Sequence, residues 1–192
     1  MGINDIIYGI IFTPKETFAG LCSDRKKTGW AIAFFLIIML VQSITGHALA
    51  AQNGALLFAW PKIILGFYWS GKLIACLLTL FLMIGFISLL ADLFYRKKDT
   101  VGLLITFCFA ALPGALGAGL QLAMAFIGLN RLGVCFAIFT FLWILALQVI
   151  SIKTVLEIKT EQALALLLSP VIIVVLSVII VVMSGTFLGS LF

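Results

Sequence analysis

Residues 101–128 read VGLLITFCFAALPGALGAGLQLAMAFIG and contain no charged side chain. About 20 residues of α-helix cross a hydrocarbon core about 30 Å thick, so this stretch is long enough to span a membrane. Its apolar residues run continuously instead of alternating with period two, which favours a helix over a strand of a membrane barrel. The stretch therefore predicts a transmembrane helix.

Four other stretches meet the same length requirement. The predicted spans cover about residues 30–51, 71–94, 101–128, 132–152 and 164–188. The chain is 64% hydrophobic and only 10% charged, whereas about a quarter of a soluble domain is charged. Lipid must therefore be the solvent for most of it, and we expect an all-α, polytopic transmembrane helical bundle of five spans that forms one domain over residues 29–192.

Residues 1–28 show the spacing of short helices at a membrane surface. Isoleucines recur at helical intervals between positions 3 and 11, the pattern of an amphipathic interfacial helix. The sequence TPKE at 13–16 then offers a capping threonine, a proline for the first helical position and the glutamate of a capping box. We expect a second short helix here that holds Phe18 and Leu21 against the bilayer or the bundle.

Charge placement predicts the orientation. With the N-terminus in the cytoplasm, nine lysines and arginines fall on the inner side, and only Lys62, Lys72 and Arg131 fall on the outer side, as the positive-inside rule requires. These three outer cations are candidate contacts for lipid head groups. All acidic residues fall on the inner side, which argues against an outward-facing Ca²⁺ or Mg²⁺ site.

The connection between the first two spans, residues 52–70, is too apolar for an ordinary solvated loop. It contains Trp60, Pro61, Tyr68 and Trp69, and indole and phenol rings favour the head-group region. An interfacial or re-entrant piece on the outer side is therefore expected, with an aromatic belt favoured over a binding groove.

The third span should be kinked, because Pro113 interrupts its hydrogen-bond ladder and Gly114 follows directly. Small residues also recur at every fourth position in two rows, which lets another helix approach closely. The rows are Ala110, Gly114 and Ala118, and Ala111, Ala115 and Gly119. Pro113, Gly114, Ala118 and Gly119 are therefore candidates either for helix packing, within the bundle or between protomers, or for a gating hinge.

Polar residues inside the spans are uncharged and scattered. They are Gln42, Ser43, Thr45 and His47 in the first span, Gln121 in the third, and Gln148 and Ser151 in the fourth. Hydrogen bonds between helices would satisfy them, although a polar pathway could also use them. Beyond the fourth span, Lys153, Glu157 and Glu161 recur at i, i+4 spacing, which predicts a charged helical extension at the inner surface.

No pattern indicates catalysis. The cysteines at positions 22, 76, 108 and 135 are widely spaced with no C-x-x-C, so no zinc or redox motif is present. Nucleotide-binding, metalloprotease and serine-hydrolase motifs are also missing. We expect no catalytic residue, metal or cofactor, and no nucleic-acid partner, because no basic stripe is interleaved with aromatic residues.

The order of features resembles the Yip1-domain family, in particular its short bacterial members. The likeness is carried by Phe12-Thr13-Pro14-Lys15-Glu16-Thr17-Phe18, by Ala111-Leu112-Pro113, and by Lys159-Thr160-Glu161-Gln162-Ala163-Leu164. The resemblance implies five spans, a cytoplasmic N-terminus and a short outer C-terminus in a bacterial plasma membrane. Eukaryotic relatives act in vesicle traffic with Rab GTPases, but their Asp-Leu-Tyr-Gly-Pro motif is missing here, which argues against Rab-type partnering.

Two kinds of function remain open. The first is a non-enzymatic membrane scaffold or adaptor, acting in membrane organisation or trafficking-like processes. Its partners would be the lipid bilayer, further copies of the chain or other membrane proteins. The second is a small transporter, channel or lipid-handling protein that uses the kink at Pro113 and the outer cations.

Overall fold

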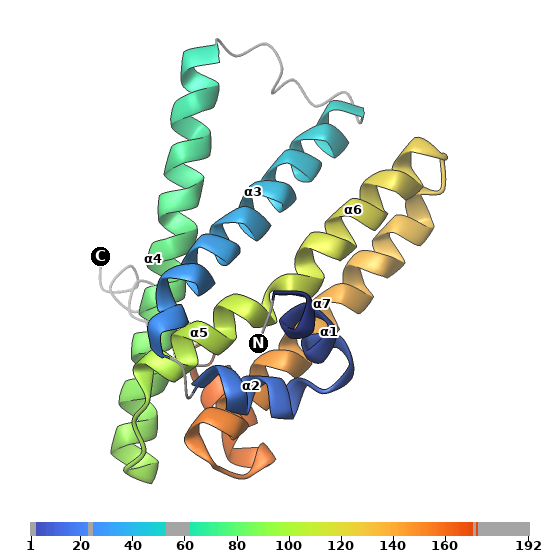
Figure 1. Ribbon diagram of the computed structural model, residues 1–192. Coiled ribbons are helices and arrows are strands. Elements are labelled where there is room, and N and C mark those ends of the chain that lie inside the picture. Colours follow the sequence, from blue (N-terminus) through green and yellow to red (C-terminus); the bar gives the residue numbers. More distant parts are fainter. Residues whose placement is uncertain (1–2, 23–24, 53–61, 171, 173–192) are drawn as a thin grey trace, which may run out of the picture.

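The computed structural model describes residues 3–22, 25–52, 62–170 and 172, and this part of the chain is helical without any strand (Figure 1). The elements are α1 (Ile3–Phe12), α2 (Pro14–Cys22), a short 3₁₀ helix η1 (Arg25–Lys27), α3 (Thr28–Gln52), α4 (Lys62–Tyr95), α5 (Thr100–Ala110), α6 (Leu112–Phe126) and α7 (Asn130–Leu156). Residues 160–170 form a further helical segment.

Four stretches of the described chain are long and apolar enough to cross a membrane. They are Arg25–Leu49, Ser70–Tyr95, Thr100–Phe126 and Asn130–Leu156, close to the first four predicted spans. Of the predicted fifth span, residues 164–170 are helical, and most of the remainder lies outside the described residues. The described residues therefore form a helical membrane bundle with four candidate spans, and the fifth span stays a prediction.

Part of the connection between the first two candidate spans is helical, and its expected interfacial or re-entrant placement stays a prediction. Helix α4 already begins at Lys62, so the second half of the segment expected at the interface continues into the span as helix. Helix α4 runs without a break to Tyr95, since no proline between residues 62 and 95 interrupts its backbone hydrogen bonds. Residues 53–61, which include Trp60, lie outside the described residues.

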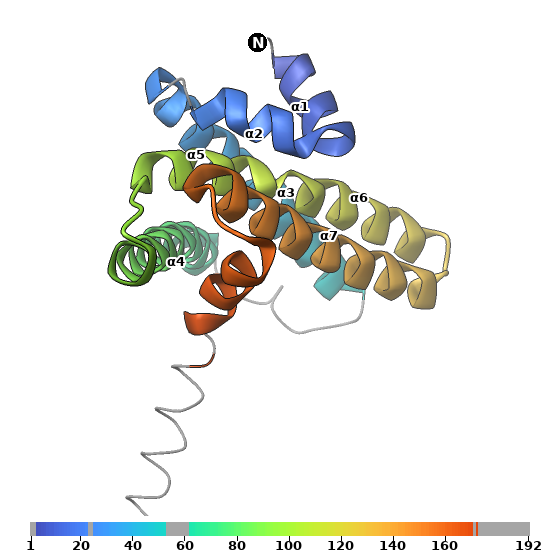
Figure 2. The ribbon, with the colours of Figure 1, turned by 90° about the horizontal axis from the view of Figure 1, so that it is seen from below.

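The segment from Thr100 to Phe126 is the centre of the bundle. In the most apolar 18-residue stretch of this segment 78% of the residues are buried inside the protein, compared with 17–22% in the matching stretches of the other three candidate spans. Every residue from Gly102 to Ala110 is buried, because α5 packs against α2, α3, α4 and α7. Figure 2 shows α2 on one side of α5 and α4 on the other.

The predicted kink is a complete break between two helices. Helix α5 ends at Ala110 and α6 begins at Leu112, with Pro113 in the first turn of α6. The first turn is where proline is tolerated, since its missing N–H would have no partner there. Helices α6 and α7 then form a hairpin (Figure 1). Gly128, at φ 81°, allows its tight turn, in which the amide of Leu129 donates to the carbonyl of Met124 at 2.8 Å.

The two N-terminal helices pack against the bundle. Phe18 and Leu21 are fully buried, and α2 contacts α5 and α7, so these two side chains face the protein and not the bilayer. On α1, Ile6 and Ile10 are also buried in the core. The apolar face of the N-terminal helices therefore covers protein, and their position relative to a membrane surface stays a prediction.

Candidate functional site

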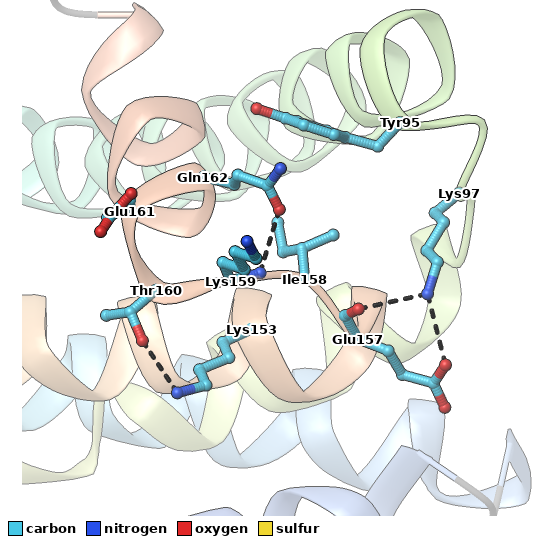
Figure 3. Close-up of a pocket in the computed structure, with 9 residues that line it drawn as sticks. All are labelled: Tyr95, Lys97, Lys153, Glu157, Ile158, Lys159, Thr160, Glu161 and Gln162. Atoms are coloured by element: carbon cyan, nitrogen blue, oxygen red, sulfur yellow. Dashed lines mark hydrogen bonds and ion pairs between the residues drawn. The ribbon is translucent and has the colours of Figure 1, made fainter.

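A cavity of about 740 Å³ lies where the C-terminal end of α4 meets the C-terminal end of α7 (Figure 3). We call it the lysine pocket. Its lining is Tyr95, Lys97, Lys153, Glu157, Ile158, Lys159, Thr160, Glu161 and Gln162. The lining contains three lysines and two glutamates, so the formal charge of the pocket is positive.

The pocket exists because the chain turns at Glu157. Helix α7 ends at Leu156, and Glu157 takes left-handed backbone angles, φ 49° and ψ 48°. The next helical segment begins at Thr160. The predicted helical extension through Lys153, Glu157 and Glu161 is therefore wrong, because a left-handed residue cannot continue an α-helix.

Contacts from the residues just after α4, from α7 and from the following helical segment hold this turn. Lys97 Nζ donates to the backbone carbonyl of Glu157 at 3.2 Å and to its Oε2 at 3.3 Å. The side-chain oxygen of Gln162 accepts from the backbone N–H of Lys159 at 3.0 Å. Lys153 Nζ donates to the hydroxyl of Thr160 at 2.8 Å. These contacts join the turn to the chain that follows α4, and they join the end of α7 to the helical segment that begins at Thr160.

A second cavity, of about 340 Å³, lies between α3, α6 and α7 within the candidate spans. We call it the glutamine cavity. Its lining is Gln42, Thr45, Gly46, Leu49, Gly114, Gly117, Ala118, Gln121, Ala137, Thr140, Phe141 and Ile144. The structure thus brings together polar residues that lie on three different spans in the sequence.

Glycines on α6 allow this close arrangement. A β-carbon at Gly114 would collide with the side-chain amide of Gln42, and one at Gly117 would collide with Thr140. Gly119 differs, since no described atom lies within 4 Å of a β-carbon placed there. One row of small residues therefore faces the bundle, and the other ends at an open position.

A family model described as the Yip1 domain matches residues 8–183. The chain belongs to the Yip1-domain family. No curated protein and no solved structure matched it. Together with the apolar helices, membership identifies a transmembrane protein, and it fits a non-enzymatic role at the membrane.

Both cavities fall inside the matched Yip1 domain, but the predicted outer cations do not take part in either. Lys72 and Arg131 are exposed and line neither the lysine pocket nor the glutamine cavity. The side chain of Lys62 lies outside the described residues. Contact of these cations with head groups therefore stays a prediction.

The described part of this Yip1-domain chain has no cluster of metal-ligating side chains. No three His, Cys, Asp or Glu side chains there lie close enough to hold a metal ion. The cysteines are free thiols, of which Cys108 is buried and Cys22 is half-buried. Burial, with a smaller contribution from the negative charge of Asp99, raises the pKa of the Cys22 thiol to about 11, so this thiol is a poor nucleophile at neutral pH.

Sequence reasoning missed the lysine pocket. Lys97, Lys153 and Lys159 were all expected on the inner side, which is the one signal that could have indicated their proximity. The turn at Glu157 that brings them to a common cavity has no glycine or proline to mark it.

Proposed function

We propose that this Yip1-domain protein is a non-enzymatic membrane scaffold or adaptor that associates with itself or with other membrane proteins. The observation that carries the proposal is the open side of α6. Ala111, Ala115 and Gly119 change along this row from buried to half-buried to exposed. Leu116 and Leu120, which flank Gly119, are 50% and 45% exposed.

Such a surface suits helix association in lipid. An apolar side chain gains about the same free energy from contact with lipid as from contact with another helix. Association is therefore driven by the close backbone approach that small residues allow. Gly119 offers that close approach, and the neighbouring leucines can pack around it. The inward row at Gly114 is already used by α3, which leaves the outward row for a partner.

The proposal includes a bacterial plasma-membrane location with the N-terminus in the cytoplasm. Nine cations against three support this orientation. Arg25 lies 3.8 Å from Asp99, and Lys97 pairs with Glu157, so η1 and the ends of α4 and α7 share one end of the bundle. In this orientation α1 and α2 form a cytoplasmic layer, where a scaffold would meet soluble or membrane partners.

The test is association measured in native membranes and in lipid nanodiscs. Crosslinking and native mass spectrometry should find a defined oligomer or a reproducible protein partner. Gly119→Leu should weaken that complex at least about tenfold, which corresponds to loss of about 1.4 kcal/mol. Gly85→Leu is the matched control, because Gly85 is also exposed on a span and no described atom lies within 4 Å of a β-carbon placed there. A monomer without partners in both lipid systems would contradict the proposal.

A second candidate function is a small transporter, channel or lipid-handling protein. The glutamine cavity favours it, because amide and hydroxyl groups of Gln42, Gln121 and Thr140 gather beside the break at Pro113. Flux of small polar solutes through proteoliposomes, abolished by Gln42→Leu, is the expected result for this function. Equal leakage from protein-free and protein-containing vesicles, together with a specific complex, would leave the scaffold as the function.

A further inference from the structure

We propose that the lysine pocket binds the phosphate of an anionic phospholipid, whose head group enters between the ends of α4 and α7 and is held by Lys153 and Lys159. The site is separate from the open side of α6 on which the scaffold proposal depends. The pocket, of about 740 Å³, has room for a phosphate and its glycerol ester.

The first argument is the position of the pocket. Tyr95 ends one candidate span and Leu156 ends another, and the lining begins at these ends. Where two spans leave the hydrocarbon, the surrounding lipid presents its head groups. Tyrosine favours this level, and lysine stems reach it by snorkelling. A phosphate at this depth therefore needs no path through the hydrocarbon.

The second argument is the hydrogen-bonding capacity of the lysines. Lys153 Nζ donates to the neutral hydroxyl of Thr160 and keeps further N–H donors, since an ammonium has three. Within the described part of the chain, the ammonium of Lys159 has no ion-pair or hydrogen-bond partner. Figure 3 shows both side chains beside the segment that carries Thr160 and Gln162.

The third argument is that the carboxylates compete weakly. Glu157 is engaged by Lys97 at 3.3 Å, and its side chain is 82% exposed. An exposed pair of this kind is screened by water and salt. Glu161 points away from Lys97 and Glu157 in Figure 3. A phosphate bound by both Lys153 and Lys159 can therefore occupy the pocket while the turn at Glu157 stays intact.

The experiment uses the full chain in nanodiscs of phosphatidylcholine with increasing phosphatidylglycerol, followed by native mass spectrometry of retained lipid. Lys153→Gln/Lys159→Gln removes two charge-assisted contacts to the phosphate and should weaken phosphatidylglycerol retention by about 25-fold. Lys153→Arg/Lys159→Arg should retain binding, which separates loss of charge from loss of folding. Glu161→Gln should strengthen binding, because it removes a like charge from the pocket.

The matched control is Lys15→Gln/Lys26→Gln, which removes the same charge from exposed lysines outside the pocket. It should change retention less than about threefold, since screening limits general attraction to the surface. Equal losses in the two glutamine double variants would overturn the site and leave only a diffuse basic surface. Displacement of phosphatidylglycerol by equimolar inorganic phosphate would also overturn it, because the ligand would then be soluble. Retained lipid on a chain that has neither an oligomer nor a protein partner in both lipid systems would support this site while contradicting the scaffold, so the two proposals fail separately.

Discussion

The hydroxyl of Ser151 on α7 donates a hydrogen bond to the hydroxyl of Thr106 on α5, and both side chains are completely buried. Thr106 in turn donates to the carbonyl of Gly102 at 2.9 Å within its own helix. This pair joins the central helix to the last of the four candidate spans. In a lipid-surrounded bundle, such a bond supplies directional specificity that apolar packing lacks.

Removing the acceptor should cost more than removing the donor. Thr106→Val leaves the Ser151 hydroxyl buried without its partner and should lower the free energy of unfolding by about 1 to 2 kcal/mol. Ser151→Ala leaves Thr106 bonded to Gly102 and should cost about 0.6 kcal/mol. Unfolding of the detergent-solubilised protein measures both values. Fully additive losses in the double variant would show that the two hydroxyls are not coupled.

Gly117 should not accept a side chain. Its added β-carbon would lie 2.6 Å from Cγ2 and 2.7 Å from Cβ of Thr140, so Gly117→Ala should destabilise the protein by about 1 to 3 kcal/mol through separation of α6 from α7. Thr140→Ala should recover only part of this loss, because the β-carbon of residue 140 remains. Gly119→Ala is the control and should be neutral or slightly stabilising, as expected for alanine at an open helical position. Similar effects at the two glycines would contradict the close α6–α7 contact.

Length and hydropathy were sufficient to place the four candidate spans approximately, because crossing lipid imposes a residue count and a composition on each span. Pro113 likewise predicted a kink at the position where α5 ends and α6 begins. Contacts between residues far apart in the sequence were not predicted. The meeting of Gln42 with Gly114 depends on how α3 approaches α6, and no local pattern encodes that approach.

The lysine pocket shows the same limit. The i, i+4 spacing of Lys153, Glu157 and Glu161 is compatible with a helix, but Lys97, which is 60 residues away from Glu157, binds the carbonyl at the turn. The contact from Lys97 thus accompanies the left-handed backbone of Glu157, at a point where the local sequence favours continuation of α7. The phospholipid site that we propose could not have been located before this turn was known.

Glu157 provides a direct test of the turn. Left-handed backbone angles cost about 1 kcal/mol for a residue with a β-carbon and almost nothing for glycine. Glu157→Gly should therefore be more stable than Glu157→Ala by about 1 kcal/mol, although both lose the ion pair with Lys97. Thermal unfolding of the two variants makes the comparison, and the shared loss of charge makes each the control for the other. Greater stability of the alanine variant would mean that α7 continues through residue 157.

The Cys22 thiol should react with alkylating reagents only at high pH in the folded protein. Burial first, and the negative charge of Asp99 second, raise its pKa from 9.0 to about 11. Because the folded state holds this proton more tightly than the unfolded state, the thiol contributes stability below about pH 9 that is lost as the pH rises to about 11. Mass spectrometry of the peptide that contains Cys22, after iodoacetamide treatment across this range, should give a midpoint near 11 in mild detergent and near 9 in denaturing detergent.

Asp99→Asn separates the two causes of this shift. Asparagine keeps a side-chain oxygen to accept from the Gly102 N–H, which Asp99 now does at 3.0 Å, so α5 should remain capped. The midpoint for Cys22 should fall once the carboxylate charge is gone, but it should stay above 9 because burial is the larger cause. A folded-state midpoint near 9 in the unsubstituted protein would mean that water reaches Cys22 freely, and that α2 does not pack against α5 as it does in the structure.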